Sequence, residues 1–198
     1  MLICPGVVTL PGFFDQDEID EINSFVLRHQ MVYGTTAADG KTSEERAAAR
    51  LGGSEYRMSR IGFIDRRVTY TCEPFVKFDA AIEYVNKTYF DQPIGKPEVW
   101  EGYQYADYDE DYQGFYKPHK DSGGSDNMRS RLISASLQLT DPSTYEGGEL
   151  IIYPRGVGRL SHTAPKEIGT LTIFLSNIVH EVRPVTKGLR NSLVTWVH

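Results

Sequence analysis

The sequence has few cysteines, which excludes two classes of small-domain scaffold. Cys4 and Cys72 are the two cysteines among 198 residues, and they lie far apart with no Cys-x-x-Cys pair. Disulfide frameworks and zinc ribbons both need several cysteines at characteristic short spacings. Neither scaffold is therefore expected, and a reducing compartment is the simplest interpretation.

Long hydrophobic runs are missing as well. No stretch approaches the roughly 18 uninterrupted apolar residues of a membrane-spanning helix. Residues 1–14 are mostly apolar, but they lack a basic start and are broken by prolines and glycines, which makes a poor signal peptide. We therefore expect no membrane partner and a cytoplasmic location.

An excess of positive charge is also absent. The formal net charge is -6 and the pI is near 5.4. A negative field of this kind repels the phosphates of nucleic acids and of anionic membranes. Nucleic-acid binding is therefore not expected, although single basic side chains can still hold small anionic ligands.

Two kinds of pattern divide the chain near residue 98. Before it, apolar residues recur at spacings of three and four in residues 17–29 and 75–89, which predicts two helices. Strands are predicted at residues 7–10 and 57–64. After it, short apolar runs alternate with Gly, Pro, Asp and Ser, which predicts strands at residues 99–105, 115–120, 132–139, 149–153, 170–175, 179–185 and 192–197.

This order of elements predicts one mainly β (α+β) domain over residues 1–198. Residues 98–198 would form a jelly-roll core, a cupin-like double-stranded β-helix, and residues 1–97 a helical support with a lid region. Residues 34–55 lose apolar periodicity apart from an Ala-rich piece, so they are either a connection or a lid. Candidates for barrel-lining positions, or simply for core, are Ile133, Leu137, Ile152, Leu171 and Ile173.

The segment YKPHKD, residues 116–121, holds the first candidate ligands. Side chains alternate along a strand, so His119 and Asp121 point the same way with Cα atoms roughly 7 Å apart. An imidazole and a carboxylate can then share one metal ion. A lone His-x-Asp is a weak signal, because a histidine near a turn is more often solvated or packed in a core.

Four other histidines compete for the place of a third ligand. His29 ends a predicted helix, His198 is the last residue, and His162 lies in a predicted loop. His180 stands between two hydrophobic runs, where a strand would aim it into the barrel. Two histidines and one carboxylate on one face of a metal leave three positions open, as in non-haem Fe(II) oxygenases.

An arginine ten residues after His180 adds a possible anion contact. Arg190 follows a turn and begins the next predicted strand, which can pair beside the strand of His180. A guanidinium there would hold a carboxylate through two hydrogen bonds. The alternative is a surface salt bridge of little energetic weight.

The stretch before the His-x-Asp pair is rich in tyrosine and acid. It is either an acidic surface loop or the rim of a pocket that offers stacking surfaces and hydroxyl donors. Its tyrosines are Tyr103, Tyr105, Tyr108, Tyr112 and Tyr116.

Taken together with YEGGEL (145–150) and HEVRPVTKGLR (180–190), these residues resemble Fe(II)/2-oxoglutarate-dependent dioxygenases of the prolyl 4-hydroxylase-like superfamily. The bacterial PKHD-type hydroxylases are the nearest likeness. The resemblance implies that His119, Asp121 and His180 bind Fe(II), with 2-oxoglutarate and O2 as co-substrates and ascorbate as a candidate reductant. The implied reaction is C–H hydroxylation with release of succinate and CO2.

The resemblance also implies four co-substrate contacts. Arg190 would bind the distal carboxylate of 2-oxoglutarate, and the Ser192 hydroxyl would reach the same group. Tyr105 resembles the family tyrosine on the strand before the His-x-Asp pair. Gln138 falls where relatives offer a polar contact.

The substrate is open at the level of sequence. By resemblance it is a prolyl residue in a peptide or protein, and residues 107–112 would suit a basic or proline-rich peptide. A free amino acid or small metabolite is the alternative substrate. Two other classes of function also stay open, a non-catalytic cupin-like binding module and a metal-dependent hydrolase that activates water.

Overall fold

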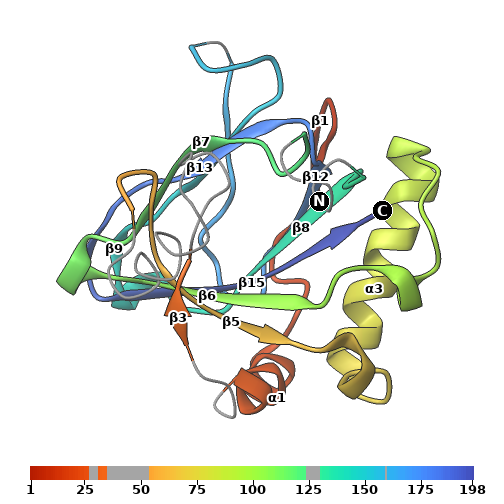
Figure 1. Cartoon of the computed structure of the whole chain (residues 1–198), viewed down its shortest axis with the longest axis horizontal. Coiled ribbons are helices and arrows are strands. Elements are labelled where there is room, and N and C mark those ends of the chain that lie inside the picture. The colour runs from red at the N-terminus through yellow and green to blue at the C-terminus, as the bar shows by residue number, and fades with distance from the viewer. Residues whose placement is uncertain (27–30, 35–53, 124–129, 159) are drawn as a thin grey trace, which may run out of the picture.

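Two antiparallel sheets lie against each other in the computed structural model, which describes residues 1–26, 31–34, 54–123, 130–158 and 160–198. The larger sheet has the order β1-β2-β12-β8-β15-β6-β5-β3, and the smaller has the order β11-β10-β13-β7-β4. Strands β14 and β9 form a separate pair. Figure 1 shows the helices at one side of these strands. The predicted class, mainly β with a helical layer, is confirmed.

The strands of the larger sheet are β1 (Leu2–Cys4), β2 (Val7–Leu10), β12 (Leu171–Leu175), β8 (Ile133–Gln138), β15 (Leu189–Val197), β6 (Tyr103–Asp109), β5 (Arg60–Ile64) and β3 (Val32–Tyr33). Those of the smaller sheet are β11 (His162–Thr163), β10 (Leu150–Tyr153), β13 (Val179–Val182), β7 (Phe115–His119) and β4 (Arg57–Met58). The separate pair is β9 (Glu146–Gly147) with β14 (Val185–Lys187).

The described helices are α1 (Gln16–Val26) and α3 (Glu73–Val85), and α3 continues as a π-helical turn, Asn86–Phe90. Short 3₁₀ turns cover Arg66–Val68, Pro97–Val99, Glu110–Tyr112 and Pro142–Thr144. None of the described helices is long and apolar enough to span a bilayer.

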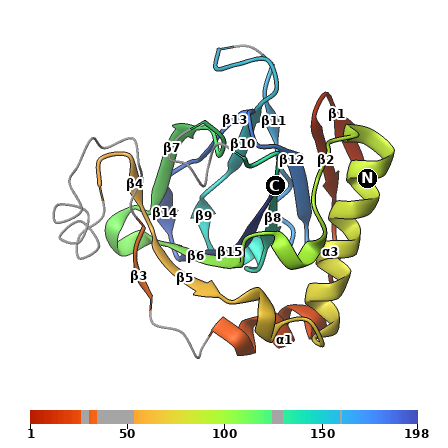
Figure 2. The same cartoon turned by 45° about the vertical axis from the view of Figure 1, so that its right-hand side comes forward.

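A capping box fixes the start of α1. The Asp15 carboxylate accepts from the backbone N–H of Glu18 at 3.0 Å, and the Glu18 carboxylate accepts from the N–H of Asp15 at 2.9 Å. The buried face of α1, with Ile19 and Ile22, then packs in one core with α3 and the larger sheet. Figure 2 shows both helices on the side of the molecule away from β7.

Alternation along the strands of the larger sheet separates this core from the space between the sheets. On β8, Ile133, Ala135 and Leu137 belong to the helix-side core, while Ser136 lines a cavity between the sheets. On β15, Leu193 faces the helices, and the cavity is lined by the residues of opposite parity. One face of each strand therefore packs the helices, and the other forms the cavity.

This alternation corrects the predicted barrel lining. Ile133, Leu137, Leu171 and Ile173 all belong to the core beneath the helices and do not line the cavity. Ile152 lies between the sheets, opposite His180 in the β10–β13 register, but it is fully buried behind the cavity wall. The core alternative is confirmed and the barrel-lining alternative is wrong, because hydrophobicity alone does not tell which of two buried faces a strand turns toward a site.

Most predicted elements are confirmed, with several changes of boundary. The strand expected at 57–64 is two strands, β4 and β5, which belong to different sheets, and the strand expected at 192–197 begins at Leu189. The strand expected at 99–105 begins at Tyr103 and extends to Asp109, because a 3₁₀ turn occupies Pro97–Val99. The strand expected at 179–185 stops at Val182, since Pro184 has no N–H for a ladder, and Val185 starts β14. The lid prediction falls mainly on residues 35–53, outside the described residues. The division at residue 98 stays a prediction.

Leu137→Ala is expected to lower the free energy of unfolding by about 2 to 5 kcal/mol, because it leaves a cavity in the fully buried layer beneath the helices. Urea denaturation followed by circular dichroism measures the change. The matched control is Ser136→Ala on the opposite face of β8, with an expected change below about 1 kcal/mol. Equal losses in the two variants would contradict the assignment of faces.

Candidate active site

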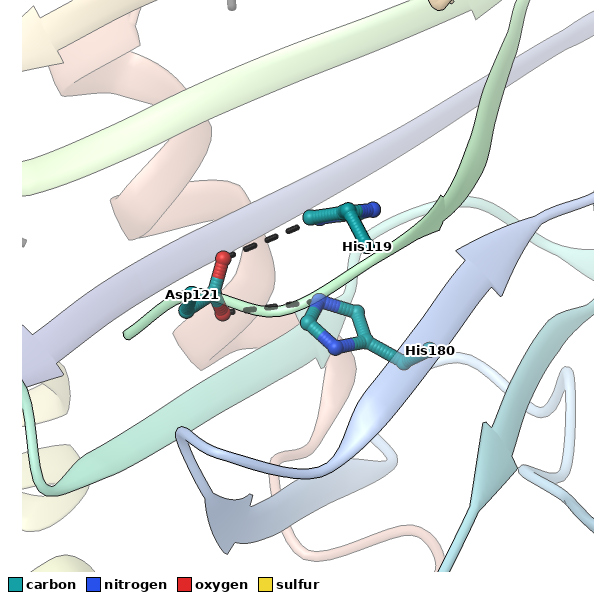
Figure 3. Close-up of side chains that lie close together, drawn as sticks. All are labelled: His119, Asp121 and His180. Carbon is teal, nitrogen blue, oxygen red and sulfur yellow. Dashed lines mark ion pairs between the residues drawn. The ribbon is translucent and has the colours of Figure 1, made fainter. Parts of the chain in front are cut away.

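Strand pairing brings two histidines from distant parts of the sequence together. In the β7–β13 register His119 stands opposite His180, so both rings leave the same face of the sheet. Asp121 follows the end of β7, where its backbone N–H donates to the carbonyl of Ser176 at 3.0 Å. Figure 3 shows the carboxylate turned toward both rings.

The three side chains form a compact donor set. His119 Nε2 lies 3.7 Å from Asp121 Oδ1, and His180 Nε2 lies 3.4 Å from Asp121 Oδ2 (Figure 3). One ligand atom from each residue lies within 4.8 Å of the other two. Two imidazoles and one carboxylate at such distances can hold one divalent cation on a single face and leave the opposite side open.

Backbone carbonyls set the tautomer of both rings. His119 Nδ1 lies 2.8 Å from the carbonyl of Lys117, and His180 Nδ1 lies 3.1 Å from the carbonyl of Ile178. A carbonyl accepts only, so Nδ1 carries the proton in each ring. Each Nε2 is left with its lone pair toward Asp121, as a metal ligand requires.

Burial and hydrogen bonding favour the ligand forms of these groups. Burial, followed by the nearby His180, holds the pKa of His119 well below its usual value, so that ring is neutral. Burial raises the pKa of Asp121, but the nearby His180 and a hydrogen bond outweigh it and lower the pKa overall. That hydrogen bond comes from Ser134 Oγ, 2.7 Å from Asp121 Oδ2.

Aromatic rings hold the two imidazoles in place. Tyr116 stacks on His119 with ring centroids 3.4 Å apart, and Phe174 meets His180 edge-on at 4.6 Å. The guanidinium of Arg57 lies over the ring of Tyr116, with its central carbon 4.6 Å from the ring centroid. These contacts restrict the rings before any ligand arrives.

Arg190 faces the same cavity, of about 420 Å³, that the three candidate ligands line. Its side chain is fully buried, at 1% exposure. Nη2 donates to Gln138 Oε1 at 2.7 Å and Nη1 to Ser192 Oγ at 3.4 Å, while Nε has no hydrogen-bond partner. Among the described residues no acidic side chain forms an ion pair with it. A buried cation without a counter-ion is costly, so this site fits a carboxylate ligand.

The Glu-Gly-Gly motif supports Arg190 from behind. Gly148 has φ +67°, and a Cβ on it would lie 2.8 Å from Cδ of Arg190. Tyr145 Oη accepts from Gln138 Nε2 at 2.6 Å, which fixes the amide that holds the guanidinium. Glycine at 148 is therefore needed both for its backbone conformation and for the room it leaves.

The structure places only some of the four predicted co-substrate contacts at the cavity. Arg190 and Ser192 line the cavity, and Gln138 lies behind Arg190 as its hydrogen-bond partner. The predicted contact of Tyr105 with the co-substrate is wrong, because Tyr105 lies on the other face of β6 and packs against the helix-side core. Tyr108, of opposite parity, stands opposite Arg190 in the β6–β15 register, with its ring centroid 5.3 Å from the guanidinium carbon.

Sequence reasoning therefore missed Tyr108 and Tyr145 as neighbours of Arg190. The alternation of side chains along β6 could have identified Tyr108, but the predicted strand ended at residue 105 and did not include it. The other expectations for the tyrosine-rich segment are met in part. Tyr116 and Tyr108 line the cavity, whereas Tyr112 donates to the Asp107 carboxylate at 2.5 Å. That carboxylate also pairs with Arg60, so it is not a free acidic surface for a basic peptide.

A family model described as the 2OG-Fe(II) oxygenase superfamily matches residues 103–198, which include the three candidate ligands and Arg190. Residues 103–198 belong to this superfamily. A PKHD-type hydroxylase from Gloeothece citriformis is 28% identical over 194 residues, which cover 96% of this chain and 77% of the relative. The oxygenase thus shares most of its length with that protein.

Solved structures share its fold. A prolyl hydroxylase from Trichoplax adhaerens, in complex with a hypoxia inducible factor peptide fragment, has a TM-score of 0.70 at 19% identity, covering 97% of this chain and 83% of that one. The non-heme α-ketoglutarate-dependent epimerase SnoN from nogalamycin biosynthesis has a TM-score of 0.65 at 15% identity, covering 98% and 78%.

The residues of the oxygenase fit the groups that its family uses, Fe(II) and 2-oxoglutarate. The donor set is the two-histidine, one-carboxylate type, and the unpaired guanidinium of Arg190 stands in the same cavity. Family membership confirms the predicted class of enzyme and favours it over a non-catalytic binding module and a hydrolase.

His180→Ala is expected to weaken Mn(II) binding by more than the roughly 10- to 100-fold loss typical of an outer-shell change. The reason is that the substitution removes one of the three metal donors, His119, Asp121 and His180. Electron paramagnetic resonance of free Mn(II) during titration gives the affinity. His162→Ala is the control, since His162 bonds to Thr9 instead. Unchanged affinity in His180→Ala would contradict the metal centre.

Gly148→Ala is expected to weaken 2-oxoglutarate binding while Mn(II) affinity is retained, because the new methyl group displaces Arg190. Calorimetric titration of the Mn(II)-loaded protein measures both. Gly156→Ala is the matched control: its φ is +91° and nothing lies within 4 Å of the added Cβ. Both variants bear a backbone penalty of about 1 to 2 kcal/mol, but only the first should lose co-substrate affinity.

Proposed function

We propose that this enzyme hydroxylates an unactivated C–H bond with Fe(II) and 2-oxoglutarate, and that its substrate is a prolyl residue in a peptide or protein. The observation that carries the proposal is the unpaired, buried Arg190 in the cavity lined by His119, Asp121 and His180. A carboxylate co-substrate and a metal then have separate places in one enclosed space.

Each residue has a role in this proposal. His119, Asp121 and His180 would hold Fe(II), and Arg190 with the Ser192 hydroxyl would hold the distal carboxylate of 2-oxoglutarate. Bound together with O2, these groups supply the oxidising chemistry and release succinate and CO2.

Supporting side chains position these groups and form an apolar part of the cavity wall. Gln138 and Tyr145 keep the guanidinium of Arg190 in one orientation. An apolar wall, formed by Leu150, Phe174, Val182 and Trp196, limits water near the reacting carbon.

A peptide substrate is supported by the peptide-bound hydroxylase among the structural neighbours. A small-molecule substrate is the second candidate, because a cavity of about 420 Å³ also has the size of a small-ligand pocket and the epimerase shares the fold. Succinate release from 2-oxoglutarate with Fe(II) and ascorbate tests the two, with proline-rich peptides in one arm and free amino acids in the other. Stimulation by free amino acids alone would overturn the peptide proposal.

Arg190→Ala is expected to abolish 2-oxoglutarate turnover while metal binding is retained, since the side chain lies beside the co-substrate place and outside the donor set. Succinate release and Mn(II) titration measure the two properties separately. Arg183→Ala, which changes a half-exposed arginine on the outer surface, is the control. Loss of metal with normal co-substrate affinity would contradict the assigned roles.

A further inference from the structure

The cavity contains more positive charge than the proposed co-substrate needs. Its lining includes three arginines, Arg57, Arg131 and Arg190, and two acids, Glu101 and Asp121. Arg131 is neutralised within the protein: its Nε lies 2.5 Å from Glu101 Oε1 and its Nη2 lies 2.7 Å from Oε2. Asp121 belongs to the metal donor set. Among the described residues that line the cavity, Arg57 therefore has no acidic partner.

Arg57 is buried and held rigidly. Its exposure is 5%, and its Nε donates to Ser59 Oγ at 2.6 Å. Its guanidinium lies over the ring of Tyr116, and a Cβ on Gly34 would lie 2.8 Å from its Cζ. Among the described residues it has no carboxylate partner. The Nη edge is thus the part of the group left to face the cavity.

A count of charges in the loaded site leaves Arg57 unbalanced. The two carboxylates of 2-oxoglutarate and the carboxylate of Asp121 balance Fe(II) and Arg190. Arg131 and Glu101 balance each other. The guanidinium of Arg57 remains as a buried positive charge, which is costly in a low-dielectric cavity unless an anion joins it.

We infer that Arg57 is a second anion anchor and that the substrate presents a carboxylate to it. This rests on the proposed function and narrows its substrate. The stack of Arg57, Tyr116 and His119 places this anchor next to the metal centre. The carboxylate belongs to an acidic side chain near the target residue or to a peptide C-terminus, or, for the second candidate substrate, to a free amino acid.

Binding of matched probes to the Mn(II)- and 2-oxoglutarate-loaded protein without O2 tests this inference. The first pair is proline and prolinamide. The second is Pro-Glu and Pro-Gln, each with both ends blocked, and the third is Gly-Pro with a free C-terminus and Gly-Pro with an amidated C-terminus. At least one carboxylate member is expected to bind on the order of 30-fold more tightly than its amide partner. The pair that discriminates identifies the source of the carboxylate. Equal or absent binding of all pairs overturns the inference.

Variants of Arg57 separate anchoring from support of the ring stack. Arg57→Gln is expected to remove the preference for the carboxylate probe, whereas Arg57→Lys keeps the charge and part of the preference. Arg60→Gln, which changes an arginine outside the cavity, is the control. If Arg57→Gln instead weakens both probes equally, or weakens Mn(II) or 2-oxoglutarate binding, the role is structural and the inference is wrong.

The binding arms need no turnover, so they separate this inference from the proposed function. A carboxylate preference that depends on Arg57, in a protein that never releases succinate, supports the anchor and contradicts the hydroxylase proposal. Succinate release stimulated equally by both members of every pair supports the proposal and overturns the anchor.

Discussion

The register between β7 and β13 is the constraint on which the metal centre depends. His119 and His180 are 61 positions apart in sequence yet lie directly opposite each other on neighbouring strands. A slip of one residue would turn one ring to the far face of the sheet. The rings of His119 and His180 meet across the two strands with centroids 4.2 Å apart, and the loop after β7 is tied by the backbone N–H groups of Asp121 and Ser122 to the carbonyl of Ser176. The donor set is thus a consequence of sheet geometry.

A second constraint acts on the larger sheet, where each strand divides its residues between two buried layers. The layer beneath the helices is apolar, whereas the layer between the sheets carries Ser136, Ser192 and Arg190. Burial of that guanidinium is tolerated because Gln138 and Tyr145 form a fixed hydrogen-bonded support, and because Gly148 leaves room for its side chain. Stability and ligand binding therefore use opposite faces of the same strands.

Sequence reasoning reached the fold and the proximity of four residues because these depend on local signals. The short strands have turn residues between them, and the His-x-Asp pair and Arg190 stand in recognisable surroundings. It failed for Tyr105 and for the barrel lining because both faces of β6 and of β8 are buried. The polar face of β8, which includes Ser136, turns toward the cavity and not toward solvent, so polarity did not mark the outside of the sheet. Only pairing with β15 decides which parity meets Arg190.

The two unpaired guanidinia give the cavity its chemical character. A chain of net charge -6 with 27 acidic residues leaves Arg57 and Arg190 without an acidic partner among its described residues, while Arg60, Arg66 and Arg131 each have one. Burying these two guanidinium groups without acidic partners is costly for folding, and it is useful only when ligands bring the missing negative charge. Anion binding would then return part of that cost as affinity, so the charge pattern ties the stability of the loaded enzyme to the occupancy of its site.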